Sequence, residues 1–213
     1  HLIVFIWGWS PILGKQISLQ ALQLVWYRIG ITVIAIALYN IYIKQKFRLS
    51  AKQYIYLVLT GGVIAFHWFC FYHAIKVSNV SVTLAAFATG TLFTSITEPI
   101  FYKRKVLWYE MLFGLIIIAA IAMIFKVETK YAWGIIFGVL AALTSSLFTV
   151  WNGIFVRDIE SPVISLVELV GGFIFLSIYL LFNGNFNAEF FVLSTNDLSF
   201  LILFAVVGTA FPF

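Results

Sequence analysis

The sequence is poor in charged residues. Its 213 residues include 13 Lys or Arg and 8 Asp or Glu, together 10%, whereas a soluble domain usually carries about 25%. A soluble protein of this size needs a polar shell, which a chain with 63% hydrophobic residues cannot supply. The composition therefore excludes a soluble enzyme and a nucleic-acid-binding protein, and it predicts that the lipid bilayer is the main partner.

Cysteine and clustered metal ligands are also scarce. Cys70 is the only cysteine, so neither an internal disulfide nor a paired-cysteine metal site can form. Asp158 and Asp197 are expected on opposite sides of the membrane, which excludes an aspartate cluster for Mg²⁺. His67 and His73 are six residues apart and do not share a helix face, as a two-histidine metal site requires. We expect no metal and no cofactor.

Long apolar runs make up most of the chain. A membrane-spanning helix needs about 20 mainly apolar residues. Runs of this length occupy 20–43, 53–75, 80–102, 106–125, 131–156 and 162–182. Two shorter runs, 2–14 and 198–213, are interpreted as spans cut by the ends of the sequence. The predicted fold is all-α, a polytopic membrane helix bundle with about eight helices, the first and last incomplete.

The basic residues between the runs predict the orientation. One alternate set of loops holds Lys44, Lys46, Arg48, Lys52, Lys103, Arg104, Lys105 and Arg157. The other set holds only Lys15, Lys76, Lys126 and Lys130. Because cytoplasmic loops carry the excess of Lys and Arg, the first set is expected in the cytoplasm and the loop 183–197 outside.

A weak internal repeat relates two of the runs. An offset of 140 residues places Arg28 on Glu168 and Tyr39 on Tyr179, each in a helix that follows an apolar helix and a short polar turn. A repeat unit of five helices would insert its second copy in the opposite orientation, because five is odd. Inverted repeats are typical of secondary transporters, whose substrate site lies near the middle of the membrane between the halves.

A longer pattern runs from residue 71 to residue 125. It has an aromatic residue before Ala-Ile, a turn with two serines, a helix of small residues, a basic turn and another helix with small residues. The residues are Tyr72, Ala74, Ile75, Ser78, Ser81, Ala85, Ala86, Ala88, Gly114, Ala119 and Ala120. This pattern resembles the EamA-type members of the drug/metabolite transporter superfamily. Arg28 matches an arginine of the family's second helix, and Gly134, Ala141 and Ala142 resemble the opening of its second repeat.

The resemblance implies ten helices in two inverted five-helix repeats. The first repeat would cover 1–126 with an incomplete first helix, and the second, truncated, would cover 131–213. It also implies a secondary transporter of the bacterial inner membrane that exports small metabolites or amino-acid-like compounds by alternating access. Thr91, beside Gly90, stands where the family often has proline, and 103–105 is basic where the family often has a glutamate. A mechanism that uses that glutamate cannot be transferred.

Charged side chains inside spans are costly and are therefore functional candidates. Arg28, expected about 12 Å below the outer surface, could bind an anionic substrate group or could serve packing. Glu168, about 9 Å from the cytoplasmic surface, could carry a proton, because burial disfavours a charged carboxylate. It could instead be an internal partner of Arg28 or form a hydrogen bond to a neighbouring helix. We expect both to point into a central cavity.

Four further residues are candidates for the same cavity. His67 lies mid-helix beside Trp68 and could line the cavity or pack through a hydrogen bond. Trp7 belongs to a kink-prone segment with Gly and Pro in the first helix, and Asn152 occupies a comparable place in the sixth.

The sequence supports other functions less well than it supports a transporter. The sequence contains no GxxxxGK[ST] motif, so it gives no sign that the chain itself binds ATP. An intramembrane enzyme is an alternative, although 144–146 lacks the glycines that frame a nucleophilic serine. A non-transporting membrane assembly subunit is another. We expect a transporter of a small-molecule substrate and no enzyme. The sequence does not indicate the oligomeric state.

Overall fold

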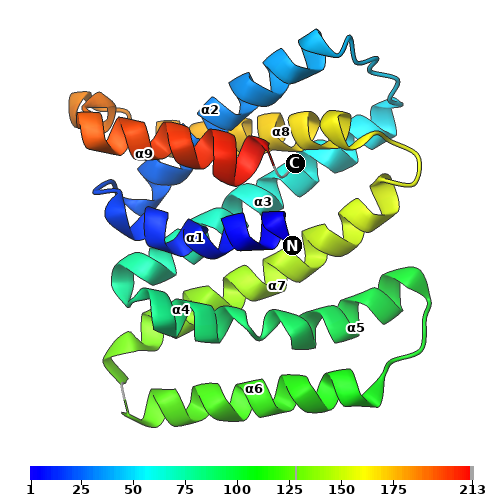
Figure 1. Cartoon of the computed structure of the whole chain (residues 1–213), viewed down its shortest axis with the longest axis vertical. Coiled ribbons are helices and arrows are strands. Elements are labelled where there is room, and N and C mark those ends of the chain that lie inside the picture. The colour runs from blue at the N-terminus through cyan, green and yellow to red at the C-terminus, as the bar shows by residue number, and fades with distance from the viewer. Residues whose placement is uncertain (128, 212–213) are drawn as a thin grey trace. The chain divides into compact units, whose positions relative to one another are not determined.

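The computed structural model describes residues 1–127 and 129–211, and helices form its framework (Figure 1). The α-helices are α1 (Leu2–Gln16), α2 (Ala21–Tyr42), α3 (Ala51–Val77), α4 (Val80–Phe87), α5 (Gly90–Tyr102), α6 (Trp108–Val127), α7 (Ala132–Phe155), α8 (Ser161–Phe182) and α9 (Thr195–Ala205). Two 3₁₀-helices, η1 (Thr129–Tyr131) and η2 (Ala188–Phe191), and a π-helix, η3 (Val206–Ala210), complete them. The described residues contain no strand.

Five helical stretches are long and apolar enough to cross a membrane. They are Ala21–Tyr42, Ala51–Val77, Val80–Tyr102, Ala132–Phe155 and Ser161–Phe182. The apolar helical stretches Trp108–Met123 and Thr195–Ala210 are shorter. The prediction of an all-α, polytopic membrane helix bundle is confirmed.

The structure refines two of the predicted runs. The run 80–102 is divided into α4 and α5 by a turn at Ala88 and Thr89, where the Thr89 hydroxyl donates to the Ala86 carbonyl at 2.7 Å. Such a side-chain bond competes with helical hydrogen bonds. The last run begins earlier than predicted, because Ser194 caps α9 and accepts from the backbone N–H of Asp197 at 3.0 Å.

The chain forms two compact units, His1–Ala65 with Val156–Phe213, and Phe66–Phe155. We refer to them as unit 1 and unit 2. The boundary between the units passes through α3 and so differs from the boundary between the expected repeats. The units are defined by which residues pack together, whereas the repeats are defined by similarity between two parts of the sequence.

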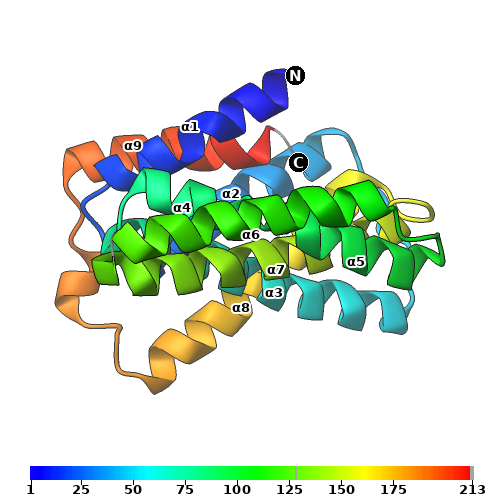
Figure 2. The ribbon, with the colours of Figure 1, turned by 90° about the horizontal axis from the view of Figure 1, so that it is seen from below.

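Unit 1 is built around the antiparallel helices α2 and α8. The Trp26 indole N–H donates to the Ser177 hydroxyl at 2.9 Å, and the Asn40 amide donates to the Pro162 carbonyl at 3.2 Å. The start of each helix therefore meets the end of the other. Helix α9 packs on α2 and α1, and Figure 2 shows α1 and α9 side by side.

Glycines bring α8 close to the first half of α3. A Cβ atom added to Gly171 would lie 2.6 Å from the Val58 carbonyl oxygen, and one added to Gly172 would lie 2.6 Å from that of Gly61. Small residues permit such close approach between membrane helices.

In unit 2, α4 and α5 lie between α6 and α7 (Figure 1). A Cβ atom on Gly138 of α7 would lie 2.6 Å from Ala86 Cβ of α4. Farther along, the hydroxyls of Thr97 and Ser146 are hydrogen-bonded at 2.6 Å. Small and hydroxyl-bearing side chains therefore fix α7 against α4 and α5.

Candidate functional site

Arg28 lies on the buried face of α2, and its side chain is held by the last described turns of unit 1. Its Nε donates to the Thr209 hydroxyl at 2.9 Å, and its guanidinium carbon lies 3.9 Å from the centroid of the Phe204 ring. Arg28 is only 4% exposed. A buried cation stacked on an aromatic ring is stabilised by the ring's quadrupole, and its flat guanidinium has a fixed direction.

The partner residue Thr209 belongs to the π-helix η3. Its hydroxyl donates to the Phe204 carbonyl at 3.3 Å while accepting from Arg28. A π-helical turn is rare and often marks a functional position. Here it brings the hydroxyl of Thr209 and the ring of Phe204 to the same guanidinium.

Glu168 is fully buried on α8, with no exposed area. The antiparallel contacts of α2 with α8 place it level with a position six to seven residues after Arg28 on α2. At 1.5 Å per residue, the two backbones are separated by about 10 Å along the helix axes. The two residues thus belong to the same helix pair of one unit, at different depths.

His67 belongs to unit 2. Its Nδ1 lies 2.8 Å from the Ala141 carbonyl oxygen, and because a carbonyl only accepts, Nδ1 is the donor. The rings of Phe148 and Phe87 surround it, with centroids 5.2 and 5.8 Å away. These contacts favour a packing role for His67 over a cavity-lining one.

The remaining three candidates differ in exposure. Trp68 is buried in unit 2 at 7% exposure, whereas Trp7, on α1 of unit 1, is 48% exposed. Asn152 is half-buried near the end of α7 in unit 2. The structure therefore places Trp7, Arg28 and Glu168 in unit 1, and the other candidates in unit 2.

Unit 2 contains a cluster of charged side chains that was not predicted from the sequence. Arg104 Nη2 lies 2.5 Å from Glu98 Oε2 and 3.4 Å from Glu110 Oε2. The three residues border a pocket of about 460 Å³. Thr91 and Thr94 also line it, on the face of α5 that carries Glu98. The spacing of 91, 94 and 98 is helical and could have indicated this polar face.

In unit 1, hydrogen bonds join two segments that are far apart in the sequence. Asp197 accepts from the backbone N–H of Ser18 at 2.7 Å and from its hydroxyl at 2.6 Å. Asp197 was expected at the end of a loop, but it lies in the first turn of α9 and joins the α1–α2 turn to that helix. The Ser194-x-x-Asp197 spacing of a capping box was the signal that could have placed it.

Metal ligands do not gather in the part of the chain that the structure describes. Residues 1–127 and 129–211 contain no group of three or more His, Cys, Asp or Glu side chains able to hold a metal ion.

Unit 1 also contains a mainly apolar pocket of about 600 Å³ beside α2, α8 and η3. Tyr39, Pro162 and Val206 are among its lining residues.

Comparison with known protein families gives a match to the first part of the chain. Residues 1–126 match the model of the EamA-like transporter family. Searches of curated proteins and of solved structures found no significant match.

Proposed function

The chain belongs to the EamA-like transporter family, and from this we propose that it is a secondary transporter that exports small, amino-acid-like metabolites by alternating access. The family and the apolar helices make it a multi-pass membrane protein of the drug/metabolite transporter type. The export direction, the substrate class, the mechanism and the bacterial inner membrane as its location belong to the proposal.

The match between α2 and α8 supports the inverted-repeat part of the proposal. Both helices have 22 residues, and Ala21 and Ser161, at which they begin, are 140 residues apart. The helices also end alike, because Lys44 and Gly184 adopt left-handed backbone with φ of 54° and 66°. The repeats would be 1–126 and 131–213, with α2 and α8 in opposite orientations.

The hydrogen bonds after the two helices repeat as well. Gln45 N–H bonds to the Asn40 carbonyl at 2.9 Å, and Asn185 N–H bonds to the Leu180 carbonyl at 3.0 Å. Both helices thus end in a Schellman motif, in which a left-handed residue turns the chain out of the helix. The offset of 140 residues therefore relates both the start and the end of one helix to those of the other.

Arg28 and Glu168 are the proposed polar centre of the transport site. They carry opposite charges on the two helices that would be equivalent in the proposed repeats, and a charge inside a span usually faces the bundle interior or water. Arg28 would bind an anionic group of the substrate, and Glu168 would carry the coupled proton. Trp7, His67, Trp68 and Asn152 stay candidates for the cavity wall, although the hydrogen bond of His67 to Ala141 favours packing for that residue.

Solute flux in proteoliposomes tests the proposed activity. The purified chain is reconstituted without ATP, and uptake of an isotope-labelled mixture of amino acids and small metabolites is followed by mass spectrometry. We expect at least one component to cross faster than in protein-free liposomes, and an imposed pH gradient to change its rate. Permeability equal to that of empty liposomes for every component would contradict the proposal and would favour a non-transporting subunit.

A further inference from the structure

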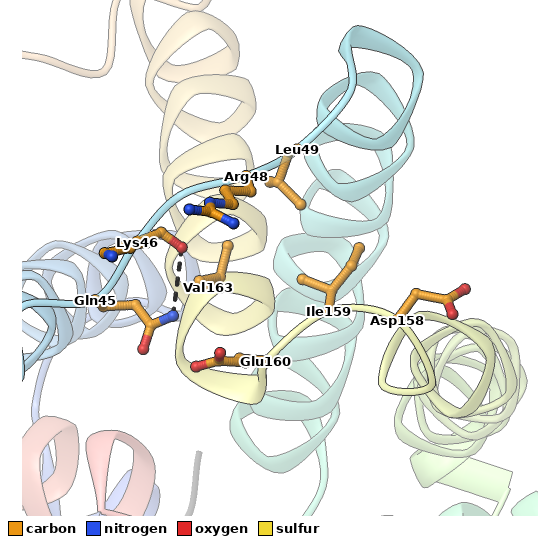
Figure 3. Close-up of a pocket in the computed structure, with 8 residues that line it drawn as sticks. All are labelled: Gln45, Lys46, Arg48, Leu49, Asp158, Ile159, Glu160 and Val163. Carbon is orange, nitrogen blue, oxygen red and sulfur yellow. Dashed lines mark hydrogen bonds between the residues drawn. The ribbon is translucent and has the colours of Figure 1, made fainter.

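A second pocket of unit 1 lies where α2 leaves the apolar run and α8 enters it. Figure 3 shows the loop after α2 passing over the first turn of α8. The pocket has a volume of about 330 Å³, at the lower end for small-molecule sites. Its lining includes the charged residues Lys46, Arg48, Asp158 and Glu160. Arg28 and Glu168 do not line it.

The charged side chains of this pocket are available to a ligand. Lys46 and Arg48 carry positive charge, and Asp158 and Glu160 carry negative charge. None of the four forms an ion pair with the described residues. Glu160 precedes the first turn of α8 but makes no side-chain capping bond there. In Figure 3 the side chains of Arg48, Lys46 and Glu160 lie around the start of α8, whereas the Asp158 carboxylate points away from them.

The loop that carries the basic residues is fixed at both ends. At its start, the left-handed Lys44 and its Schellman hydrogen bonds end α2. At its end, Ser50 and Gln53 form a capping box, with Ser50 N–H donating to Gln53 Oε1 at 2.8 Å and Gln53 N–H to Ser50 Oγ at 3.3 Å. The backbone therefore presents Lys46 and Arg48 in a defined place.

Exposed aromatic side chains beside the pocket are what we expect of a site near the lipid headgroups. Tyr42, at the end of α2, is 84% exposed, and Phe47, between the two basic residues, is 42% exposed. Aromatic side chains gather where the membrane meets water, and basic pockets at helix ends bind lipid headgroups. The surrounding membrane can therefore supply the ligand.

We propose that this pocket binds the headgroup of a phospholipid that carries both a phosphate and a primary ammonium, as phosphatidylethanolamine does. Lys46 and Arg48 bind the phosphate oxygens, and Glu160 accepts hydrogen bonds from the ammonium. A choline headgroup has no ammonium hydrogen to donate. An anionic headgroup without an ammonium would bring its negative charge near Glu160 and leave that carboxylate without a positive partner.

Lipid-dependent stability of the purified full chain tests this site. The thermal midpoint in detergent is measured while phosphatidylethanolamine, phosphatidylcholine or phosphatidylglycerol is added as mixed micelles. Native mass spectrometry counts the retained lipids. We expect phosphatidylethanolamine to raise the midpoint most and to be retained preferentially. Arg48→Gln and Glu160→Gln should each weaken its apparent affinity about tenfold or more, because each removes a charge-assisted hydrogen bond.

Two controls keep the outcome interpretable. Lys52→Gln removes an exposed basic residue that does not line the pocket and should leave the lipid response unchanged. Thermal midpoints without lipid verify that each variant is folded. Equal responses to the three lipids, a preference for phosphatidylglycerol, or an unchanged response in both pocket variants would overturn the proposal. So would an equal shift with water-soluble phosphoethanolamine, because the ligand would then not be a membrane lipid.

Discussion

Gly61 packs directly against the backbone carbonyl oxygen of Glu168, with no room for a Cβ atom between them. The contact lies at the level where α3 meets the glycines of α8, next to the proposed proton carrier. Glycine therefore sets the distance between the two helix backbones at Glu168, and a larger residue would move the carboxylate together with its helix.

Replacing Gly61 with alanine should destabilise the protein. Because the obstructing atom is backbone rather than a flexible side chain, overpacking should cost about 1–3 kcal/mol. The thermal midpoint of purified Gly61→Ala in detergent measures this loss. Gly8→Ala is the matched control, since a Cβ atom at Gly8 meets no atom within 4 Å. A Gly61→Ala midpoint equal to that of Gly8→Ala would show that α3 and α8 are farther apart.

The bond between Asp197 and Ser18 should contribute to stability. Asp197→Ala leaves two donors of Ser18 without their acceptor, which should cost about 1.5–3 kcal/mol. Ser18→Ala removes only the hydroxyl and should cost less. The double variant should lose less than the two single variants together, because the residues share an interaction. Ser199→Ala, an exposed residue of α9, serves as control; additive losses would indicate no direct coupling.

The left-handed residues after α2 and α8 should respond in opposite directions to substitution. Lys44→Gly relieves the steric cost of a left-handed side chain and should stabilise the protein by about 1 kcal/mol. Gly184→Ala introduces that cost and should destabilise it by a similar amount. Thermal midpoints of the two variants measure the difference. Shifts of the same sign would contradict the shared helix ending.

The predicted orientation can be tested by labelling single cysteines in a Cys70→Ala background. Glu189→Cys should react with a membrane-impermeant maleimide in intact cells, and Lys105→Cys only after permeabilisation. Both positions are exposed. Position 187 is less suitable, because the Asn187 side chain accepts from the Phe190 N–H at 2.9 Å. The reverse labelling pattern would invert the orientation.

Helix positions could be predicted from the sequence because each apolar run is bounded by polar residues. The run predicted as 162–182 is observed as Ser161–Phe182, and 20–43 as Ala21–Tyr42. The turn at Ala88 and Thr89 could not be predicted this way, because both flanking helices are apolar and hydropathy does not register a local break. The turn lies beside Gly90 and Thr91, and Thr91 is the residue at which the sequence departs from the proline that the family often has.

The surroundings of the candidate residues were harder to predict than the residues themselves. The cost of a buried charge singled out Arg28, but its contacts with Phe204 and Thr209 join segments more than 170 residues apart in the sequence. The ion pairs of Arg104 with both Glu98 and Glu110 likewise depend on how the chain turns between α5 and α6. Periodicity describes one helix and contains no information on such pairings.

The proposed transport site is tested most directly by comparing flux through the wild-type protein with flux through Glu168→Gln in proteoliposomes. Arg28→Gln is measured in parallel. Thr209→Val removes the hydroxyl that accepts from Arg28 and donates to the Phe204 carbonyl, and Glu189→Gln is an exposed control. We expect the two control variants to retain flux of the labelled substrates. Arg28→Gln and Glu168→Gln should fold and insert normally but lose flux, and Glu168→Gln should also lose any dependence on the pH gradient. Wild-type flux in both Arg28→Gln and Glu168→Gln would show that this pair serves packing and would contradict the proposed transport site.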